Sequence, residues 1–192
     1  VETEIIRKGK SVIQAEASLV CNDNICLRAM AAFGYARETY EIPSNKSFKP
    51  KPRGSGVNFE DHAKQTPGFL QFFEGEWVND GLPFAGKLSR KLELWVRHNI
   101  DLNQFPAEKL ITICDIPPPV ILSHFSIPPI PSSSLTWSLE FVIPPEEVSS
   151  DWFFLEFRNR YPIFSQLLDD SFLSTHRLYL KVFLKHQNPS VL

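Results

Sequence analysis

One carboxylate stands out because of the residues around it. The stretch CDIPPPVIL, Cys114 to Leu122, places Asp115 in an otherwise apolar run and follows it with three prolines. Partial burial shifts the pKa of an acid toward values that are useful for proton transfer. An acid near the C-terminal end of a helix also opposes the helix dipole, so stability gives little reason for it. Asp115 is therefore a candidate functional residue; the alternative is a surface acid or turn cap where the helix frays.

The chain lacks the sequence motifs of several other enzyme classes. It has no Gly-rich phosphate loop, no G-x-S-x-G nucleophile elbow and no cluster of Cys and His residues. The five histidines are scattered: His62, His98, His124, His176 and His186. The sequence therefore predicts neither a metal site nor a cofactor.

Composition narrows the class of protein and its partners. Of the 192 residues, 43% are hydrophobic and 22% charged, which is typical of a globular protein, and 16 Phe with 16 Pro favour β-structure with Pro-marked connections. The net charge of -2 gives no electrostatic case for nucleic acid, and no apolar run reaches the roughly 20 residues of a membrane span.

Cysteine usage and the chain ends bear on the compartment. Three cysteines, an odd number, without a signal peptide predict reduced thiols in an intracellular, cytoplasmic protein. Cys21 and Cys26 flank a turn, but packing is favoured over a disulfide for both. The C-terminal PSVL lacks the basic residue of the peroxisomal S-K-L address, so a peroxisomal protein is not predicted.

A helix and a sheet are needed to position Asp115. Leu110, Ile111 and Cys114 follow helical spacing behind Asn103 and Pro106, which suit a helix start, and Pro117 disfavours helical geometry at Ile116. This helix is expected to pack against a sheet that contains a strand with Leu135, Trp137, Leu139 and Phe141 on one face. Further strands are predicted at 67–78 and 91–98, the latter with Leu92, Leu94 and Val96 on one face.

The two ends of the chain repeat one pattern. Strands at 1–8, 11–20 and 25–35 form a meander without a helix of its own, and residues 151–186 repeat its strand and turn order. Between them, residues 43–66 are rich in Pro, Gly, Ser and basic residues, which predicts a linker or long loop. A duplicated α+β unit, with one helix wrapped by a meander, explains the pattern.

Several motifs in this order resemble a known family. They are RKGKSVIQAEASLV and AMAAFG in the first half, and ELWVRH, CDIPPPVIL, SSLTWSLEFVIPP and STHRLYLKVFL in the second. Together they resemble the tandem double-hotdog acyl-CoA thioesterases. The resemblance implies a double hotdog, an antiparallel sheet wrapped around a central helix. Residues 1–42 are then the C-terminal meander of a first hotdog that lacks its start, 43–66 a linker and 67–192 the second hotdog.

The same resemblance implies roles for particular residues. Asp115 would position or activate the attacking water, and Ser134, on the strand after the helix, would hold the water or the thioester oxygen, with Thr136 as a fallback that binds substrate. The family has a Gln in its last long strand, where this chain has Arg177. Arginine cannot accept a hydrogen bond, but it can donate to an oxyanion or pair with Asp115.

The expected function is therefore hydrolysis of fatty acyl-CoA thioesters to free acid and CoA, by a chain that could form a homo-oligomer. The alternative is a catalytically impaired hotdog protein that binds acyl-CoA or serves as a scaffold. Arg177 favours the alternative and Asp115 favours the enzyme. A truncated product without a stable function is a third reading.

Overall fold

The computed structural model describes residues 1–35, 50–62, 66–79, 82–87, 89–126, 132–134, 137–141, 143–158, 166–168, 171–174 and 181–183. The chain divides into two compact units, Val1–Ser47 and Phe48–Leu192, and each is described by itself.

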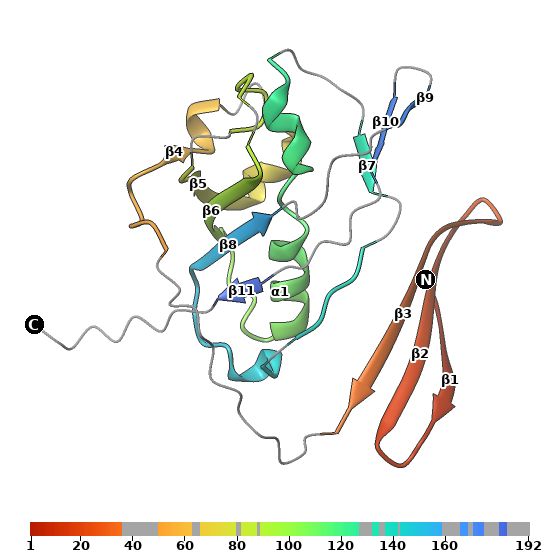
Figure 1. Ribbon diagram of the computed structural model, residues 1–192. Coiled ribbons are helices and arrows are strands. Elements are labelled where there is room, and N and C mark those ends of the chain that lie inside the picture. Colours follow the sequence, from red (N-terminus) through yellow and green to blue (C-terminus); the bar gives the residue numbers. More distant parts are fainter. Residues whose placement is uncertain are drawn as a thin grey trace, which may run out of the picture. The chain divides into compact units, whose positions relative to one another are not determined.

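The first unit is a three-stranded antiparallel meander (Figure 1), with β1 at Glu2–Lys8, β2 at Val12–Cys21 and β3 at Asn24–Gly34. Asn22 and Asp23 connect β2 to β3 with φ of 49° and 62°, a left-handed turn that Asn and Asp tolerate. The three predicted strands are confirmed. Their hydrogen-bonded partners among the described residues all lie within this unit.

The two faces of the meander differ in chemistry. Cross-strand pairs share a face, and one face carries the pairs Ile13–Phe33, Ala15–Ala31, Ala17–Ala29 and Leu19–Leu27. The opposite face carries Glu16 and Arg28, whose carboxylate and guanidinium lie 3.1 Å apart. Leu27 and Phe33 are 56% and 59% exposed, so the unit itself leaves its apolar face uncovered.

The second unit contains a five-stranded antiparallel sheet in the order β11-β8-β6-β5-β4. The strands are β4 (Val57–Asn58), β5 (Phe73–Trp77), β6 (Lys91–His98), β8 (Phe153–Arg158) and β11 (Lys181–Phe183). A smaller sheet joins β7 (Ser132–Ser134) in parallel to β10 (Ser171–Ser174), which pairs antiparallel with β9 (Gln166–Leu168). Short 3-10 helices lie at η1 (Glu60–His62), η2 (Gly68–Phe72), η3 (Val120–His124) and η4 (Pro145–Glu147).

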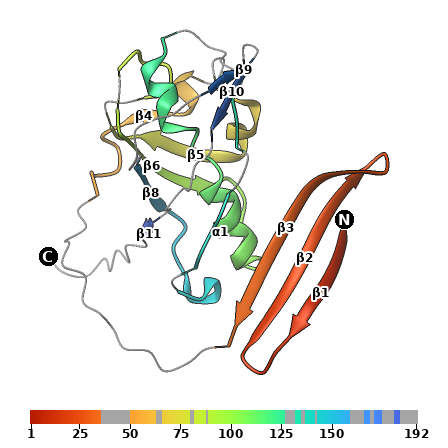
Figure 2. The same ribbon diagram turned by 45° about the vertical axis from the view of Figure 1, so that its right-hand side comes forward.

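The α-helix α1, Pro106–Cys114, packs on one face of the five-stranded sheet (Figure 2). Proline at the first helical position needs no amide hydrogen and has a suitable φ. Leu110 and Ile113 of the helix join one core cluster with Leu92, Leu94 and Val96 of β6 and with Phe153, Leu155 and Phe157 of β8. The predicted helix, and the predicted common face of Leu92, Leu94 and Val96, are confirmed.

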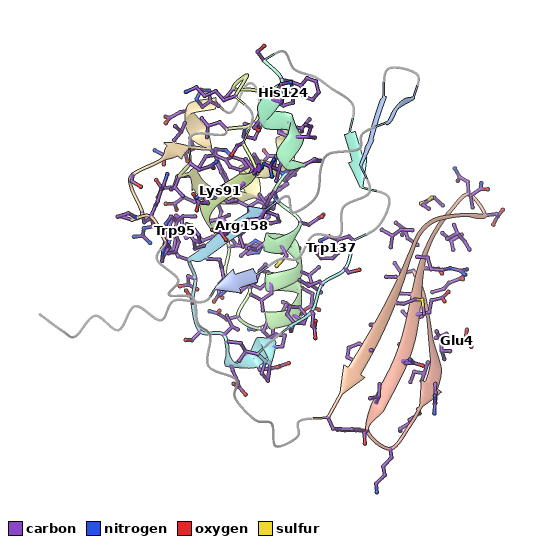
Figure 3. All side chains as sticks on the ribbon, in the orientation of Figure 1. Glu4, Lys91, Trp95, His124, Trp137 and Arg158 are labelled. Carbon is purple, nitrogen blue, oxygen red and sulfur yellow. The ribbon has the colours of Figure 1, made fainter. Side chains whose placement is uncertain are left out.

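Two predictions about this unit are wrong. Residues 137–141, including the half-buried Trp137 (Figure 3), form no strand, because the described residues offer a partner only to 132–134. The helix therefore packs on β6 and β8 rather than on Trp137 and Leu139; Leu135 lies outside the described residues. Ile111 lies on the helix as predicted, where it is 38% exposed.

The predicted linker at 43–66 is also too long. Within it, β4 pairs with β5 and the side chain of Phe59 is buried in the core. Of the predicted strand at 67–78, residues 73–77 form β5, while the preceding η2 is helical.

Candidate active site

Asp115 lies at the point where α1 ends. It is the C-cap residue, with φ -92° and ψ -5°, and the three prolines follow one residue later. The residue is exposed, and no described donor forms a hydrogen bond with its carboxylate. Loss of hydration against neighbouring protein atoms nevertheless raises the pKa of Asp115 above its ordinary value. A carboxylate of this kind is a better proton acceptor than a fully hydrated one.

The amphipathic character of α1 decides which way Asp115 faces. Leu110, Ile113 and Cys114 are buried toward the sheet. The opposite side of the helix exposes a stripe of four residues at helical spacing: Glu108, Ile111, Thr112 and Asp115. Asp115 therefore faces away from the core of its own unit.

A histidine that the sequence showed only as one of five scattered residues contacts this helix. Nε2 of His98, at the end of β6, lies 3.0 Å from Oγ1 of Thr112 and 3.2 Å from the carbonyl oxygen of Lys109. Since Thr112 donates its own proton to the Glu108 carbonyl at 2.8 Å, the shared proton belongs to the imidazole. Burial lowers the pKa of His98, more than its bond to the Lys109 carbonyl raises it.

Lys109 is a second residue that the sequence analysis missed. Its side chain is buried, and Nζ donates to Asn103 Oδ1 at 3.0 Å, to the Ser150 carbonyl at 3.0 Å and to Asp151 Oδ1 at 3.2 Å. The signal in the sequence was its position four residues before Ile113 on the predicted helix, which places the two side chains on the same buried face. All three ammonium donors are used, so Lys109 attaches α1 to the segment before β8.

The first half of α1, which includes Lys109, borders a pocket of about 400 Å³. Its lining residues come from the start of α1 and from the region of η4: Asn103, Pro106, Lys109, Leu110, Pro145, Glu146, Val148 and Ser149. Asp115 is not among them, so this pocket is separate from the candidate carboxylate.

The other predicted site residues are less completely placed. Ser134 is the last residue of β7, and its backbone pairs with Ser174 of β10. Thr136 and Arg177 lie outside the described residues. The predicted grouping of Asp115, Ser134 and Arg177 therefore stays a prediction.

The cysteines have different surroundings. Cys114 is buried, and burial, aided by the neighbouring charge of Asp115, raises its pKa to about 12, so it is an unreactive packing thiol. Cys21 and Cys26 are free as predicted, but both are exposed rather than packed.

The described residues show no sign of two other kinds of site. Those residues contain no group of three or more His, Cys, Asp or Glu side chains arranged to hold a metal ion. Among them there is also no helix long and apolar enough to cross a membrane.

A family model defines the class of protein. The model of the acyl-CoA thioesterase C-terminal domain matches residues 50–161, more than half of the 192-residue chain. The chain therefore belongs to the acyl-CoA thioesterase C-terminal domain family, which confirms the resemblance found in the sequence motifs. A search of curated proteins found none that matches the chain.

Solved structures show the same fold. The chain is 15% identical to a hotdog-fold protein of Alicyclobacillus acidocaldarius, with a TM-score of 0.62, over 87% of this chain and 60% of that one. It is 14% identical to the TesB protein of Mycobacterium avium subspecies paratuberculosis, with a TM-score of 0.50, over 85% of this chain and 60% of that one. The predicted α+β hotdog fold is confirmed, and the chain spans about 60% of the length of these relatives.

Proposed function

We propose that the chain hydrolyses fatty acyl-CoA thioesters to free acid and CoA, with Asp115 as general base. The observation that carries this proposal is the carboxylate at the end of α1. It is exposed at the surface of its unit, partly dehydrated, and held by a helix whose other side is buried in the core. The chain's membership of an acyl-CoA thioesterase family supports the choice of substrate.

In the proposed reaction, the carboxylate of Asp115 takes a proton from water as the water oxygen bonds to the thioester carbonyl carbon. The tetrahedral oxyanion then collapses, the carbon–sulfur bond breaks, and the proton held by Asp115 goes to the departing CoA thiolate. Ser134 is proposed to orient the water or the thioester oxygen, with Thr136 as the alternative hydroxyl. Arg177 is proposed to donate to the oxyanion.

The proposed double-hotdog arrangement follows from the length of the relatives. Residues 1–42 are proposed to be the C-terminal meander of a first hotdog and 67–192 the second, so that a complete protein is a double hotdog. The linker between them is proposed to be shorter than 43–66 and to end before β4, so that the second hotdog extends back to include β4, which pairs with β5. An intracellular location, and a homo-oligomer as the assembly, belong to the same proposal.

The experiment is release of free thiol from a panel of acyl-CoAs by the purified chain and its Asp115→Asn variant. We expect the variant to lose on the order of a hundredfold or more in rate, because the amide keeps the shape but cannot accept a proton. Asp61→Asn, which changes an exposed acid of η1, is the matched control and should leave the rate unchanged. An Asp115→Asn variant as fast as the parent would remove Asp115 from the mechanism.

A second candidate function rests on Arg177. An ion pair between Arg177 and Asp115 would lower the pKa of the carboxylate and weaken it as a base. The chain would then be a catalytically impaired hotdog protein that binds acyl-CoA or acts as a scaffold. This candidate predicts no thiol release by the native chain, retained affinity for acyl-CoA and no effect of Asp115→Asn.

A further inference from the structure

The exposed side of α1 presents an apolar side chain beside the candidate base. Ile111 is 38% exposed, although its neighbours Leu110 and Ile113 are buried in the core. Residues four apart on a helix lie on one face with their Cβ atoms about 5–6 Å apart. The side chain of Ile111 is therefore the neighbour of the Asp115 carboxylate, one turn toward the helix N-terminus.

The other residues on this face of the helix, Thr112 and Glu108, are polar. Thr112 is hydrogen-bonded to other groups, and Glu108 carries a charge. The hydroxyl of Thr112, three residues before Asp115, donates to the Glu108 carbonyl and accepts from the His98 imidazole. Glu108, one turn beyond Ile111, is exposed and acidic. Ile111 thus forms a short apolar surface between two carboxylates, about one turn of 5.4 Å from each.

This distribution of charge decides which part of an acyl-CoA could lie along the helix. Two carboxylates on one face repel the phosphates at the nucleotide end of CoA. An uncharged hydrocarbon chain is not repelled, and it gains from removing the Ile111 side chain from water. Ile111 is also branched at Cβ, so its rotamer in a helix is stiff and presents a fixed surface.

We propose that Ile111 is a specificity-determining residue that contacts the acyl chain of the thioester. In this arrangement the thioester carbonyl lies at Asp115, and the first carbons of the chain run along α1 over Ile111 while CoA leaves in another direction. The inference rests on the proposed function, since it assumes that the substrate carbonyl lies at Asp115. It further predicts that the contact is limited to carbons within about one helical turn of the carbonyl.

The experiment measures binding rather than turnover, with the non-hydrolysable thioethers S-ethyl-CoA and S-hexyl-CoA. The full 192-residue chain is compared with Ile111→Ala and Ile111→Lys. Ile111→Ala should weaken S-hexyl-CoA binding by about five- to tenfold and leave S-ethyl-CoA binding unchanged, because only the longer chain reaches the lost methyl groups. Ile111→Lys should weaken S-hexyl-CoA binding further.

Ile100→Ala is the matched control, because Ile100 is the same residue type and is 68% exposed in the loop before α1. It should leave both affinities unchanged. Ile111→Ala should fold normally, since the side chain is partly exposed and Ala is the stronger helix former; a thermal unfolding midpoint close to that of the parent checks this.

The outcomes separate this inference from the proposed function. Equal loss for both thioethers, no loss for either, or no binding of either to the native chain would overturn the contact with Ile111. A loss confined to S-hexyl-CoA supports the contact, even if the native chain releases no thiol and the proposed hydrolysis fails. Conversely, Asp115→Asn can abolish thiol release while Ile111→Ala affects both thioethers equally, and then only the inference about Ile111 is wrong.

Discussion

His98 couples the helix that carries Asp115 to the strand beside it. Its imidazole bonds to the Lys109 carbonyl and to Thr112 of α1, and it contacts the ring of Phe73, with ring centroids 4.7 Å apart. Because burial lowers the pKa of His98 in the folded protein, the unfolded chain binds a proton more readily than the folded one. The stability that this site contributes is therefore complete above the unfolded pKa of about 6.5 and is lost as the pH falls through the folded value.

We predict that the free energy of unfolding falls between pH 7.5 and about pH 5, and that His98→Gln removes part of this fall. Glutamine keeps a donor for the Lys109 carbonyl but does not titrate. The measurement is urea unfolding of both proteins at several pH values in this range. His124→Gln, at an exposed histidine of η3, is the control. A pH dependence that is identical in the parent and in His98→Gln would contradict the role of His98.

At the scale of residues, the sequence predicted groups whose position follows from local pattern. Asp115 at a helix end was predictable because Pro117 ends the helix and the acid stands alone in an apolar run. The exposure of Ile111 was not predictable, because the successive apolar residues Leu110 and Ile111 cannot both face one sheet and spacing alone does not show which one does. The contacts of His98 and Lys109 join distant parts of the chain, and no local pattern shows them.

The 50–56 segment shows how a stretch with the composition of a linker becomes a fixed element. The carboxylate of Glu76, 3% exposed on β5, accepts the backbone amides of Gly54 at 2.5 Å and Gly56 at 2.9 Å. Trp95 of β6 donates its indole N–H to the Lys51 carbonyl at 2.9 Å, and the Arg53 guanidinium lies 4.4 Å from the centre of the Trp152 ring. Gly56 must be glycine, because a Cβ there would collide with the backbone of Trp77.

We predict that Glu76→Gln loosens this segment. The two backbone N–H groups bond to different oxygens of the carboxylate, and glutamine replaces one of these oxygens with an NH₂ donor, so one part-buried hydrogen bond to a charged group, worth about 1.5–3 kcal/mol, is lost. Limited trypsin digestion should therefore cut after Arg53 faster in the variant than in the parent. Glu60→Gln, at an exposed acid of η1, should not change the rate of this cut. Equal cutting rates in Glu76→Gln and the parent would show that the carboxylate does not hold the segment.

At the scale of elements, a strand could be predicted from the sequence only where its pairing partners could be inferred. The strands at 91–98 and 153–158 carry alternating large apolar residues and pair with each other. Their sequence pattern was therefore sufficient to predict them. The stretch from Trp137 to Phe141 has a similar alternation but forms no strand, since alternation gives a strand only where a neighbouring strand accepts its hydrogen bonds. Composition similarly concealed the 50–56 segment, because its attachment comes from the buried Glu76 and not from its own side chains.

At the scale of the whole molecule, the apolar face of the meander is a surface through which the chain could associate. Four cross-strand pairs from Ile13–Phe33 to Leu19–Leu27 make it continuous across β2 and β3, and the unit itself does not cover it. An extended apolar sheet face left in water favours association. The sequence analysis predicted a meander of three strands without a helix of its own, and the structure of the unit confirms that meander.

We predict that the 192-residue chain associates in solution through this face. Leu27→Lys should shift the chain toward monomer, because the charge would have to be buried in the contact. Met30→Lys is a matched control on the same strand: Met30 is 76% exposed, but it pairs with Glu16 on the polar face and should leave association unchanged. Sedimentation at several protein concentrations, together with binding of an apolar dye, measures the effect. If the parent chain is monomeric and binds no dye, then its apolar face is already covered within the chain; if Met30→Lys acts as strongly as Leu27→Lys, association uses another surface.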